Sequence, residues 1–389
     1  MEQSAVKGAA RKVVEAAQDE LVTLSRQIHD RPELCFEETY ASERVAETLA
    51  AGGFAVETGA YDLPTAFEAR AGSGPLSIVI CAEYDALPGI GHACGHNLIA
   101  ASAVGAGLAL ARVADDIGLT VTVLGTPAEE GGGGKVFLLE RGAFDDAHAA
   151  MMVHPWPEDL LETTCLAVDH MTIRYEGRDA HASASPEKGI NAGDAFVVAQ
   201  VAIGLLRQHL AAGNQVHGIV NKGGDAANIV PKEATGTWMI RARTIEDLAA
   251  LRPRIEHCFE AGALATGSTL EIVDLSPTYS HFEGDAELLA KWRTNAEDLG
   301  RRYPADDPRR VLPTISTDMA NVSLALPTIH PMIGVDAKGA VNHQPEFAAA
   351  CVGPSAEQAL FDGAVGMAWT TIDAATDPAL RDRLLKARS

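Results

Sequence analysis

The sequence predicts an α/β fold in which a small α+β domain is inserted into a larger one. Its 389 residues exceed the size of most single domains, and its 47% hydrophobic and 22% charged residues are typical of a globular protein. Strand patterns alternate with helical patterns at first, and the pattern changes after about residue 168. We therefore expect a larger domain formed by residues 1–168 and 280–389, and an inserted domain formed by residues 169–279.

The larger domain begins with a predicted helix over residues 13–28, whose apolar residues recur at helical spacing. This helix should end by Arg31, because Pro32 disfavours helical geometry in the residue before it. Strands and helices then alternate, which is typical of βαβ units with a largely parallel sheet. The expected strands are 76–82, 119–125 and 149–154, and the expected helices follow Asn97 and cover 135–144.

The inserted segment shows a strand, a helix, two strands, a helix and a strand, which is the ferredoxin-like order. Pro253 should kink the second of these helices or begin a new one, because proline has no backbone N–H to donate. The expected strands are 168–177, 217–221, 234–244 and 269–275, and the expected helices are 192–211 and 245–263.

Charge and composition limit the partners of the protein. A formal net charge of −22 argues against nucleic-acid binding, which requires Lys and Arg side chains that neutralise phosphates. The most apolar stretch, 98–114, is slightly too short to cross a membrane and is rich in Gly and Ala, so we interpret it as a buried helix. Without a secretory signal, six cysteines do not indicate a disulfide framework. We expect a cytoplasmic protein that binds neither nucleic acid nor membranes.

Two pairs of neighbouring residues can bind metal ions. Cys94 and His96 stand two residues apart in GHACGH, where a glycine permits a tight turn. Glu129 and Glu130 follow the predicted strand 119–125, at the edge where open α/β sheets bind ligands. One carboxylate can bind metal while its neighbour takes a proton from water, as metal-assisted hydrolysis requires. Taken alone, each pair is more often ordinary loop or surface chemistry.

Two further histidines complete a predicted two-metal site. His154 ends an apolar strand and His343 lies near the C-terminus in VNHQPEF, and each alone is compatible with a structural role. Together these groups can hold two ions about 3.5–4 Å apart that share one water and polarise a carbonyl, with Glu129 as the general base. The predicted ligands of the two ions are Cys94, His96, Glu130, His154 and His343.

Eight segments, in matching order over nearly the whole chain, carry a resemblance to a known family. They resemble the aminoacylase and glutamate carboxypeptidase family of two-metal peptidases, and more narrowly its amidohydrolase branch. That branch contains indole-acetyl-amino-acid hydrolases, aminobenzoyl-glutamate hydrolases and β-alanyl-lysine-type dipeptidases. The segments are RPELCFEE (31–38), EYDALPGIGHACGHN (83–97), TPAEEGGGGK (126–135), MVHP (152–155), GRDAHASASPEKGINA (177–192), NIVPKEATGTWMIRAR (228–243), STDMANVS (316–323) and NHQPEF (342–347).

The resemblance implies a catalytic domain with a central mixed sheet flanked by helices, and an inserted lid domain that forms a homodimer. It assigns the five ligands above, and it makes Glu129 the base and later the proton donor to the leaving amine. Asp85, in YDALP, would orient a ligand or its water. His181, in AHASASP, would stabilise the oxyanion, typically in the partner subunit's active site. Asn228 and Arg241 would contact the substrate and its carboxylate.

The reaction implied by the resemblance is hydrolysis of the amide bond of an N-acyl amino acid or a dipeptide-like substrate by a metal-bridged water. The thiolate ligand favours zinc, with manganese and cobalt as alternatives. One alternative function is a hydrolytic deaminase that uses the same two-metal site. Another is a binding protein without catalysis, which should lack a ligand or the base, whereas this chain has both.

Several other residues have competing interpretations. His92 competes with His96 as a metal ligand, although the resemblance places the ligand at the latter. Asp318 either lines the substrate pocket or caps a helix. The histidines that we expect to be structural are His170, His217, His281 and His330.

Overall fold

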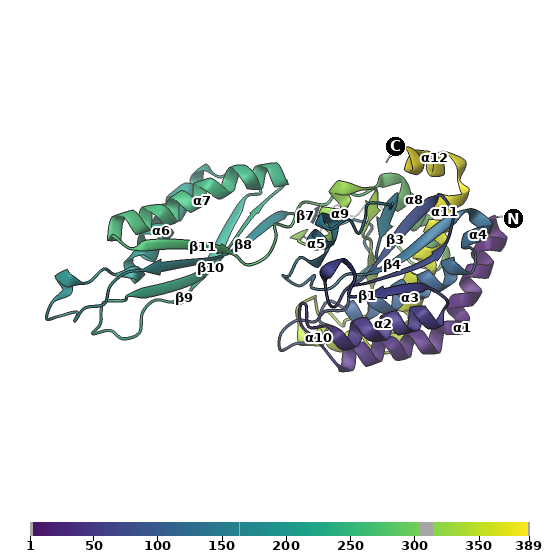
Figure 1. Cartoon of the computed structure of the whole chain (residues 1–389), viewed down its shortest axis with the longest axis horizontal. Helices are drawn as coiled ribbons and strands as arrows, with labels where there is room; N and C mark the ends of the chain where they lie inside the picture. The colour runs from purple at the N-terminus through teal and green to yellow at the C-terminus, as the bar shows by residue number, and fades with distance from the viewer. Residues whose placement is uncertain (1–2, 163, 304–313, 388–389) are drawn as a thin grey trace. The chain divides into compact units, whose positions relative to one another are not determined.

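The computed structural model divides the chain into two compact units (Figure 1). The first unit comprises residues 1–164 and 282–389, and the second comprises residues 165–281. Each unit has its own sheet, its own covering helices and its own hydrophobic core. The residues that the structure describes are 3–162, 164–303 and 314–387.

Eight strands of the first unit form a six-stranded mixed sheet and one short parallel pair. They are β1 (Ala55–Thr58), β2 (Phe67–Gly72), β3 (Leu76–Ala82), β4 (Leu119–Gly125), β5 (Ala149–Met151), β6 (His154–Trp156), β13 (Thr328–Ile329) and β14 (Met332–Gly334). In the sheet order β1-β2-β4-β3-β5-β13, the last four strands run parallel, and β1 and β2 add an antiparallel edge. Burial of β3 and β4 on both faces explains their continuous apolar sequences.

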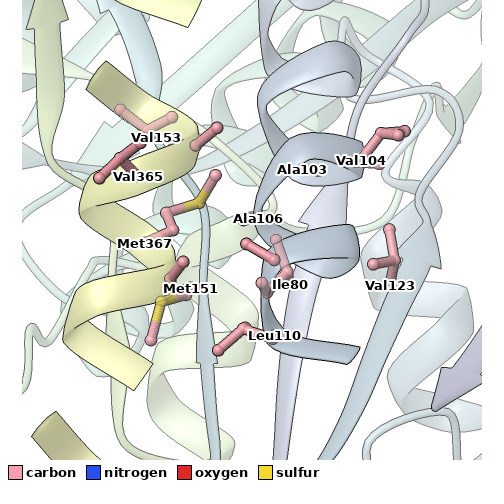
Figure 2. Packing of buried hydrophobic residues seen from close by; sticks show 14 of the residues in the cluster. Ile80, Ala103, Val104, Ala106, Leu110, Val123, Met151, Val153, Val365 and Met367 are labelled. Atoms are coloured by element: carbon pink, nitrogen blue, oxygen red, sulfur yellow. The ribbon is translucent and has the colours of Figure 1, made fainter. Parts of the chain in front are cut away.

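Helices cover this sheet on both sides, and α3 is buried among them. They are α1 (Gln3–Asp30), α2 (Thr39–Ala51), α3 (His96–Ala111), α4 (Ala114–Ile117), α5 (Gly134–Glu140), α8 (Ala286–Asp298), α9 (Met319–Ala325), α10 (Pro345–Ala350), α11 (Pro354–Thr376) and α12 (Pro378–Lys386). Small residues let α1 and α11 pack closely on α3: a Cβ atom at Gly105 would lie 2.8 Å from Ala364 and 2.9 Å from Leu21. Figure 2 shows buried side chains of this core from β3, β4, β5, α3 and α11.

The second unit has the element order β-α-β-β-α-β. Its elements are β8 (Ala167–Glu176), α6 (Ala192–Leu206), β9 (Gln215–Lys222), β10 (Glu233–Ala242), α7 (Ile245–Thr266) and β11 (Thr269–Asp274). The strands pair antiparallel in the order β11-β8-β10-β9, so β9 and β11 are edge strands. The core lies between the sheet and the two helices, where the Trp238 ring stacks on Phe196 with centroids 5.2 Å apart. Two further short strands are β7 (Thr164–Cys165), where the chain enters this unit, and β12 (Thr314–Ile315).

Apart from shifted ends, as in the predicted helices 13–28 (α1) and 135–144 (α5), three predicted elements differ from the structure. The predicted strand 149–154 is two strands, because β5 pairs with β13 whereas β6 pairs with β14. The predicted helix 192–211 ends at Leu206 and continues as one 3-10 turn. Pro253 lies inside the single helix α7; its missing hydrogen bond is offset because Leu251 and Ile255 on either side are buried in the core. Among the described residues, no helix is both long and apolar enough to cross a membrane.

Candidate metal centre

All six residues predicted to form the chemical centre of the first unit lie together, near the carboxyl ends of its parallel strands. Glu129 and Glu130 follow β4, and His154 begins β6, shortly after β5. Cys94 and His96 lie at the start of α3. Loops that follow parallel strands meet at one edge of a sheet, so segments far apart in sequence converge there. His343, in the loop before α10, reaches the same place, and its Nε2 lies 3.8 Å from Glu130 Oε2.

The donor atoms form two ligand sets that share one thiol. Cys94, His96 and His154 form one set, and Cys94, Glu130 and His343 form the other; within each set the donor atoms lie within 4.8 Å of one another. A thiolate shared by two sets can bridge two ions. The first set is buried, whereas the side chain of His343 is 62% exposed.

Hydrogen bonds fix the orientation of both buried imidazoles. Nδ1 of His96 lies 3.1 Å from Asp85 Oδ1, and Nδ1 of His154 lies 2.8 Å from the carbonyl oxygen of Pro155. If each Nδ1 donates its proton to these acceptors, each Nε2 is left with a lone pair for a metal ion. Among the described residues, His96 Nε2 and Glu130 Oε1 are buried without a hydrogen-bond partner. Buried polar atoms are rarely left unpaired, so these two atoms fit a bound cation.

Gly95 allows the turn that brings Cys94 and His96 together. Its φ is +75°, a left-handed conformation that glycine adopts without steric cost. A Cβ atom at this position would also lie 2.8 Å from the ring of Pro155, directly after His154. We therefore expect any side chain at position 95 to disturb two candidate ligands at once.

Burial and charge shift the titration of these groups in the metal-free protein. Burial, reinforced by the neighbouring Glu83 and Glu130, raises the pKa of Glu129 well above its usual range. Burial and the charge of Glu130 raise the pKa of the Cys94 thiol. Burial opposes a charge on His96, yet the surrounding carboxylates, Asp85 foremost, raise its pKa well above the usual range.

A buried ion cluster beside the centre was not predicted. Nζ of Lys135 lies 2.5 Å from Glu83 Oε1 and 2.7 Å from Asp318 Oδ1, and all three side chains are fully buried. The other oxygen of Glu83 lies 3.4 Å from His96 Nε2. Among the described residues, Glu83, His96 and Glu129 form a third group of possible metal ligands. The sequence signal that could have identified Glu83 was its position, because it directly follows β3 and stands two residues before Asp85.

Contacts in the structure bear on the open interpretations of Asp318 and His92. Asp318 stands at the N-cap position of α9, but its side chain makes no capping bond there. It accepts a hydrogen bond from the backbone N–H of Lys135 at 2.9 Å, so it caps the neighbouring helix α5. His92 is buried, and its Nε2 lies 3.1 Å from the carbonyl oxygen of Ile28. His92 is absent from every group of possible metal ligands among the described residues.

His330, which we expected to be structural, lies next to the centre. Its ring centroid is 5.4 Å from that of His154, and it lines a cavity of ≈ 170 Å³ together with Glu162, Phe282 and Leu289. Neither of its ring nitrogens has a hydrogen-bond partner among the described residues. Burial lowers the pKa of His330 well below its usual range, so its imidazole is neutral.

The other three predicted site residues belong to the second unit. His181 is exposed, and its Nδ1 accepts hydrogen bonds from the backbone N–H groups of Ser183 and Ala184 at 3.3 and 3.2 Å. Asn228 is exposed nearby, since its carbonyl oxygen accepts a hydrogen bond from the N–H of Ala182. Arg241 lies on β10, and partial burial lowers its pKa. The position of each of these three residues is thus known relative to the second unit.

Comparison with known proteins identifies the class. Residues 79–358 match Peptidase family M20/M25/M40. The chain belongs to this family and is a hydrolase, as its sequence motifs predicted. Its relatives place it in the amidohydrolase branch of the family.

Two curated relatives and one solved structure illustrate the similarity. Xaa-Arg dipeptidase of Mus musculus is 37% identical over 395 residues, which cover 97% of this chain and 90% of that protein. One of the subunits of p-aminobenzoyl-glutamate hydrolase of Escherichia coli is 34% identical over 66% of this chain and 58% of its own length. The crystal structure of Bacillus subtilis YxeP, a dinuclear metal-binding peptidase, matches with a TM-score of 0.69 at 21% identity, covering 92% of this chain and 98% of that chain.

Proposed function

We propose that the protein is a two-metal amidohydrolase that cleaves an N-acyl amino acid or a dipeptide, with the reaction centred on Glu129. The observation that carries this proposal is the sharing of Cys94 by two ligand sets beside the carboxyl group of Glu129, which lies 3.8 Å from His96 Nε2. The ligands would be those predicted from the sequence: Cys94, His96 and His154 for one ion, and Cys94, Glu130 and His343 for the other.

The residues of the chain divide the chemistry among them. Two bound divalent ions would lower the pKa of an attacking water and polarise the amide carbonyl. Glu129 takes a proton from that water and later delivers it to the leaving amine nitrogen. Asp85 holds the ring of His96 and the backbone of Glu130, so it keeps the ligands in place while Glu129 moves protons.

The donor set supports zinc as the resident metal, with manganese and cobalt as alternatives. A thiolate and two imidazoles favour zinc among the common divalent ions, whereas carboxylates also suit manganese. The thiol of Cys94 has a raised pKa, so metal binding must displace its proton and should strengthen as the pH rises.

For the substrate, we infer a molecule with an amide bond next to an amino acid carboxylate. Relatives named Xaa-Arg dipeptidase and p-aminobenzoyl-glutamate hydrolase support both dipeptides and N-acyl amino acids as candidates. Arg241 and Asn228 of the second unit are suited to the carboxylate and the amide, because Arg offers paired donors.

We propose that the second unit is an inserted ferredoxin-like lid that also forms a homodimer. Helix α6 exposes Val197, Val201 and Leu205, spaced four apart on one face, with exposed fractions of 58%, 60% and 71%. The edge strand β9 adds Ile219, which is 63% exposed. Exposed apolar stripes and open strand edges favour association, and a twofold pair would cover both at once. His181 would then act at the oxyanion, in the same or the partner subunit.

A matched pair of variants tests the catalytic proposal. Glu129→Gln should bind two equivalents of metal and lose activity by at least about a hundredfold, since it removes the general base. Glu130→Gln, the neighbouring carboxylate, should instead lose metal at the set that contains His343. Activity would be measured as amine release from N-acyl amino acids and dipeptides with zinc, manganese or cobalt. Wild-type turnover by Glu129→Gln would refute the proposal, and release of ammonia in place of an amino acid would indicate a deaminase.

A further inference from the structure

The turn that carries Glu129 and Glu130 is held in an unfavourable backbone conformation. Ala128, directly before Glu129, has a φ of +60°, a left-handed conformation that residues with a Cβ atom seldom adopt. Because Ala128 adjoins Glu129, its φ and ψ set the direction in which the next two side chains leave the turn. The N–H groups of Gly132 and Gly134 hold the carbonyl oxygen of Ala128 from within the turn, whereas its own N–H is held from outside the turn.

The contact from outside the turn comes from Glu38. Its Oε1 accepts a hydrogen bond from the backbone N–H of Ala128 at 2.9 Å, and a second from the N–H of Phe36, also at 2.9 Å. Phe36 has a φ of +62°, so one carboxylate oxygen binds two residues in left-handed conformations from two different loops. Glu38 is fully buried, which strengthens both hydrogen bonds because water cannot compete for them.

Helix capping does not explain Glu38. The residue stands at the N-cap position of α2, but its side chain makes no capping bond to that helix. Glu33 caps α2 instead, since its carboxylate accepts hydrogen bonds from the N–H groups of Tyr40 and Ala41 at 3.1 and 2.9 Å. Glu33 thus caps helix α2, whereas Glu38 binds the turn that carries Glu129 and Glu130.

We propose that Glu38 is a positioning residue for the reaction: it holds Ala128 so that Glu129 and Glu130 face the metal centre. This inference rests on the proposed roles of Glu129 as base and Glu130 as ligand. Without the hydrogen bond, Ala128 can relax to a right-handed conformation and swing both carboxylates away. A displacement of about 1 Å can cost on the order of a hundredfold in rate, which sets the scale of the expected effect.

Three variants test this role in the full-length, metal-loaded protein. Glu38→Ala should lower kcat by about a hundredfold, with KM nearly unchanged, since it misplaces the base and not the substrate. Glu38→Gln should keep most of the activity, because its amide oxygen can accept both hydrogen bonds. Glu33→Ala, the matched control, should leave kcat unchanged while it destabilises α2. Wild-type kcat in a folded Glu38→Ala protein would overturn the proposal, as would a Gln variant as inactive as the Ala variant.

Hydrogen exchange of the metal-free protein gives a second readout that does not depend on catalysis. The amide of Ala128 should exchange faster in Glu38→Ala than in the wild type, and at the wild-type rate in Glu33→Ala. Equal exchange at Ala128 in all three proteins would overturn the positioning role even if the enzyme hydrolyses amides. Absence of metal-dependent hydrolysis in the wild type would refute the proposed function, while exchange would still report whether Glu38 holds the turn.

Discussion

Asp85 and His96 are joined through Oδ1 and Nδ1 at 3.1 Å, and this contact determines which nitrogen of the imidazole faces the cluster. The other oxygen of Asp85 accepts a hydrogen bond from the backbone N–H of Glu130 at 2.8 Å. One buried carboxylate therefore orients two candidate ligands, one by its ring and the other by its backbone.

Replacing Asp85 should weaken metal binding. In Asp85→Ala the ring of His96 can turn and the N–H of Glu130 loses its acceptor, so we expect affinity to fall by about 10- to 100-fold. Competition with a chromogenic chelator measures this directly. Asp362→Ala is the control, because it removes a buried carboxylate that pairs with Arg301 at 2.8 Å, away from the centre. Equal metal affinity in both variants would contradict the orienting role.

Lys135 should be important for stability. Its ammonium group neutralises two fully buried carboxylates, Glu83 and Asp318, which together raise its pKa although burial opposes the charge. Lys135→Met would leave both carboxylates uncompensated, and we expect a loss of about 3–5 kcal/mol in the free energy of unfolding. Urea unfolding of the metal-free protein measures this free energy. Adding Asp318→Asn should restore part of the loss, and a single variant as stable as the wild type would refute this account.

Glu38 should make stability depend on pH. Burial, with a smaller effect of Asp85, raises the pKa of Glu38 from 4.5 to about 7 in the folded protein. Between these values the folded protein keeps a proton that the unfolded chain releases, so this contribution is present below pH 4.5 and is lost as the pH rises through 7. At about 1.4 kcal/mol per pH unit, the change amounts to at most roughly 3 kcal/mol. The free energies of unfolding of the metal-free wild type and of Glu38→Gln should therefore diverge as the pH rises from 4.5 to 7. A difference that stays constant across this range would contradict the raised pKa of Glu38.

The apolar stripe of α6 should control the oligomeric state. We expect the wild type to have twice the chain mass of 40.9 kDa, and Val201→Asp with Leu205→Asp to be monomeric, because charges cannot be buried in an apolar interface. Leu264→Asp on α7 is the control, since this side chain is 87% exposed on the other helix and should not affect the mass. Light scattering coupled to gel filtration reports the masses. A dimeric double variant would place the interface elsewhere.

The sequence was sufficient to propose the candidate ligands, but not to identify the groups that hold them. Each candidate ligand lies in a short motif whose chemistry is visible by itself, and the structure brings these motifs together. Lys135 and Asp318, by contrast, are 183 residues apart and contact each other only in the fold. No pattern in the sequence marks Glu38, because its hydrogen bond to the backbone N–H of Ala128 is formed only in the fold. Burial and long-range pairing decide these roles, and a single sequence records neither.

Mixing two inactive variants should decide in which subunit His181 acts. Consider a dimer of one Glu129→Gln chain and one His181→Ala chain. If His181 acts in the partner's active site, one site of this dimer has both replacements and the other has neither. Random exchange between equal amounts should then restore about a quarter of wild-type activity, because half of the dimers carry one intact site. Action in the same subunit would leave every site with one replacement, and the mixture would stay inactive. Each variant measured alone, at the same total concentration, is the control, and its residual turnover is subtracted from that of the mixture.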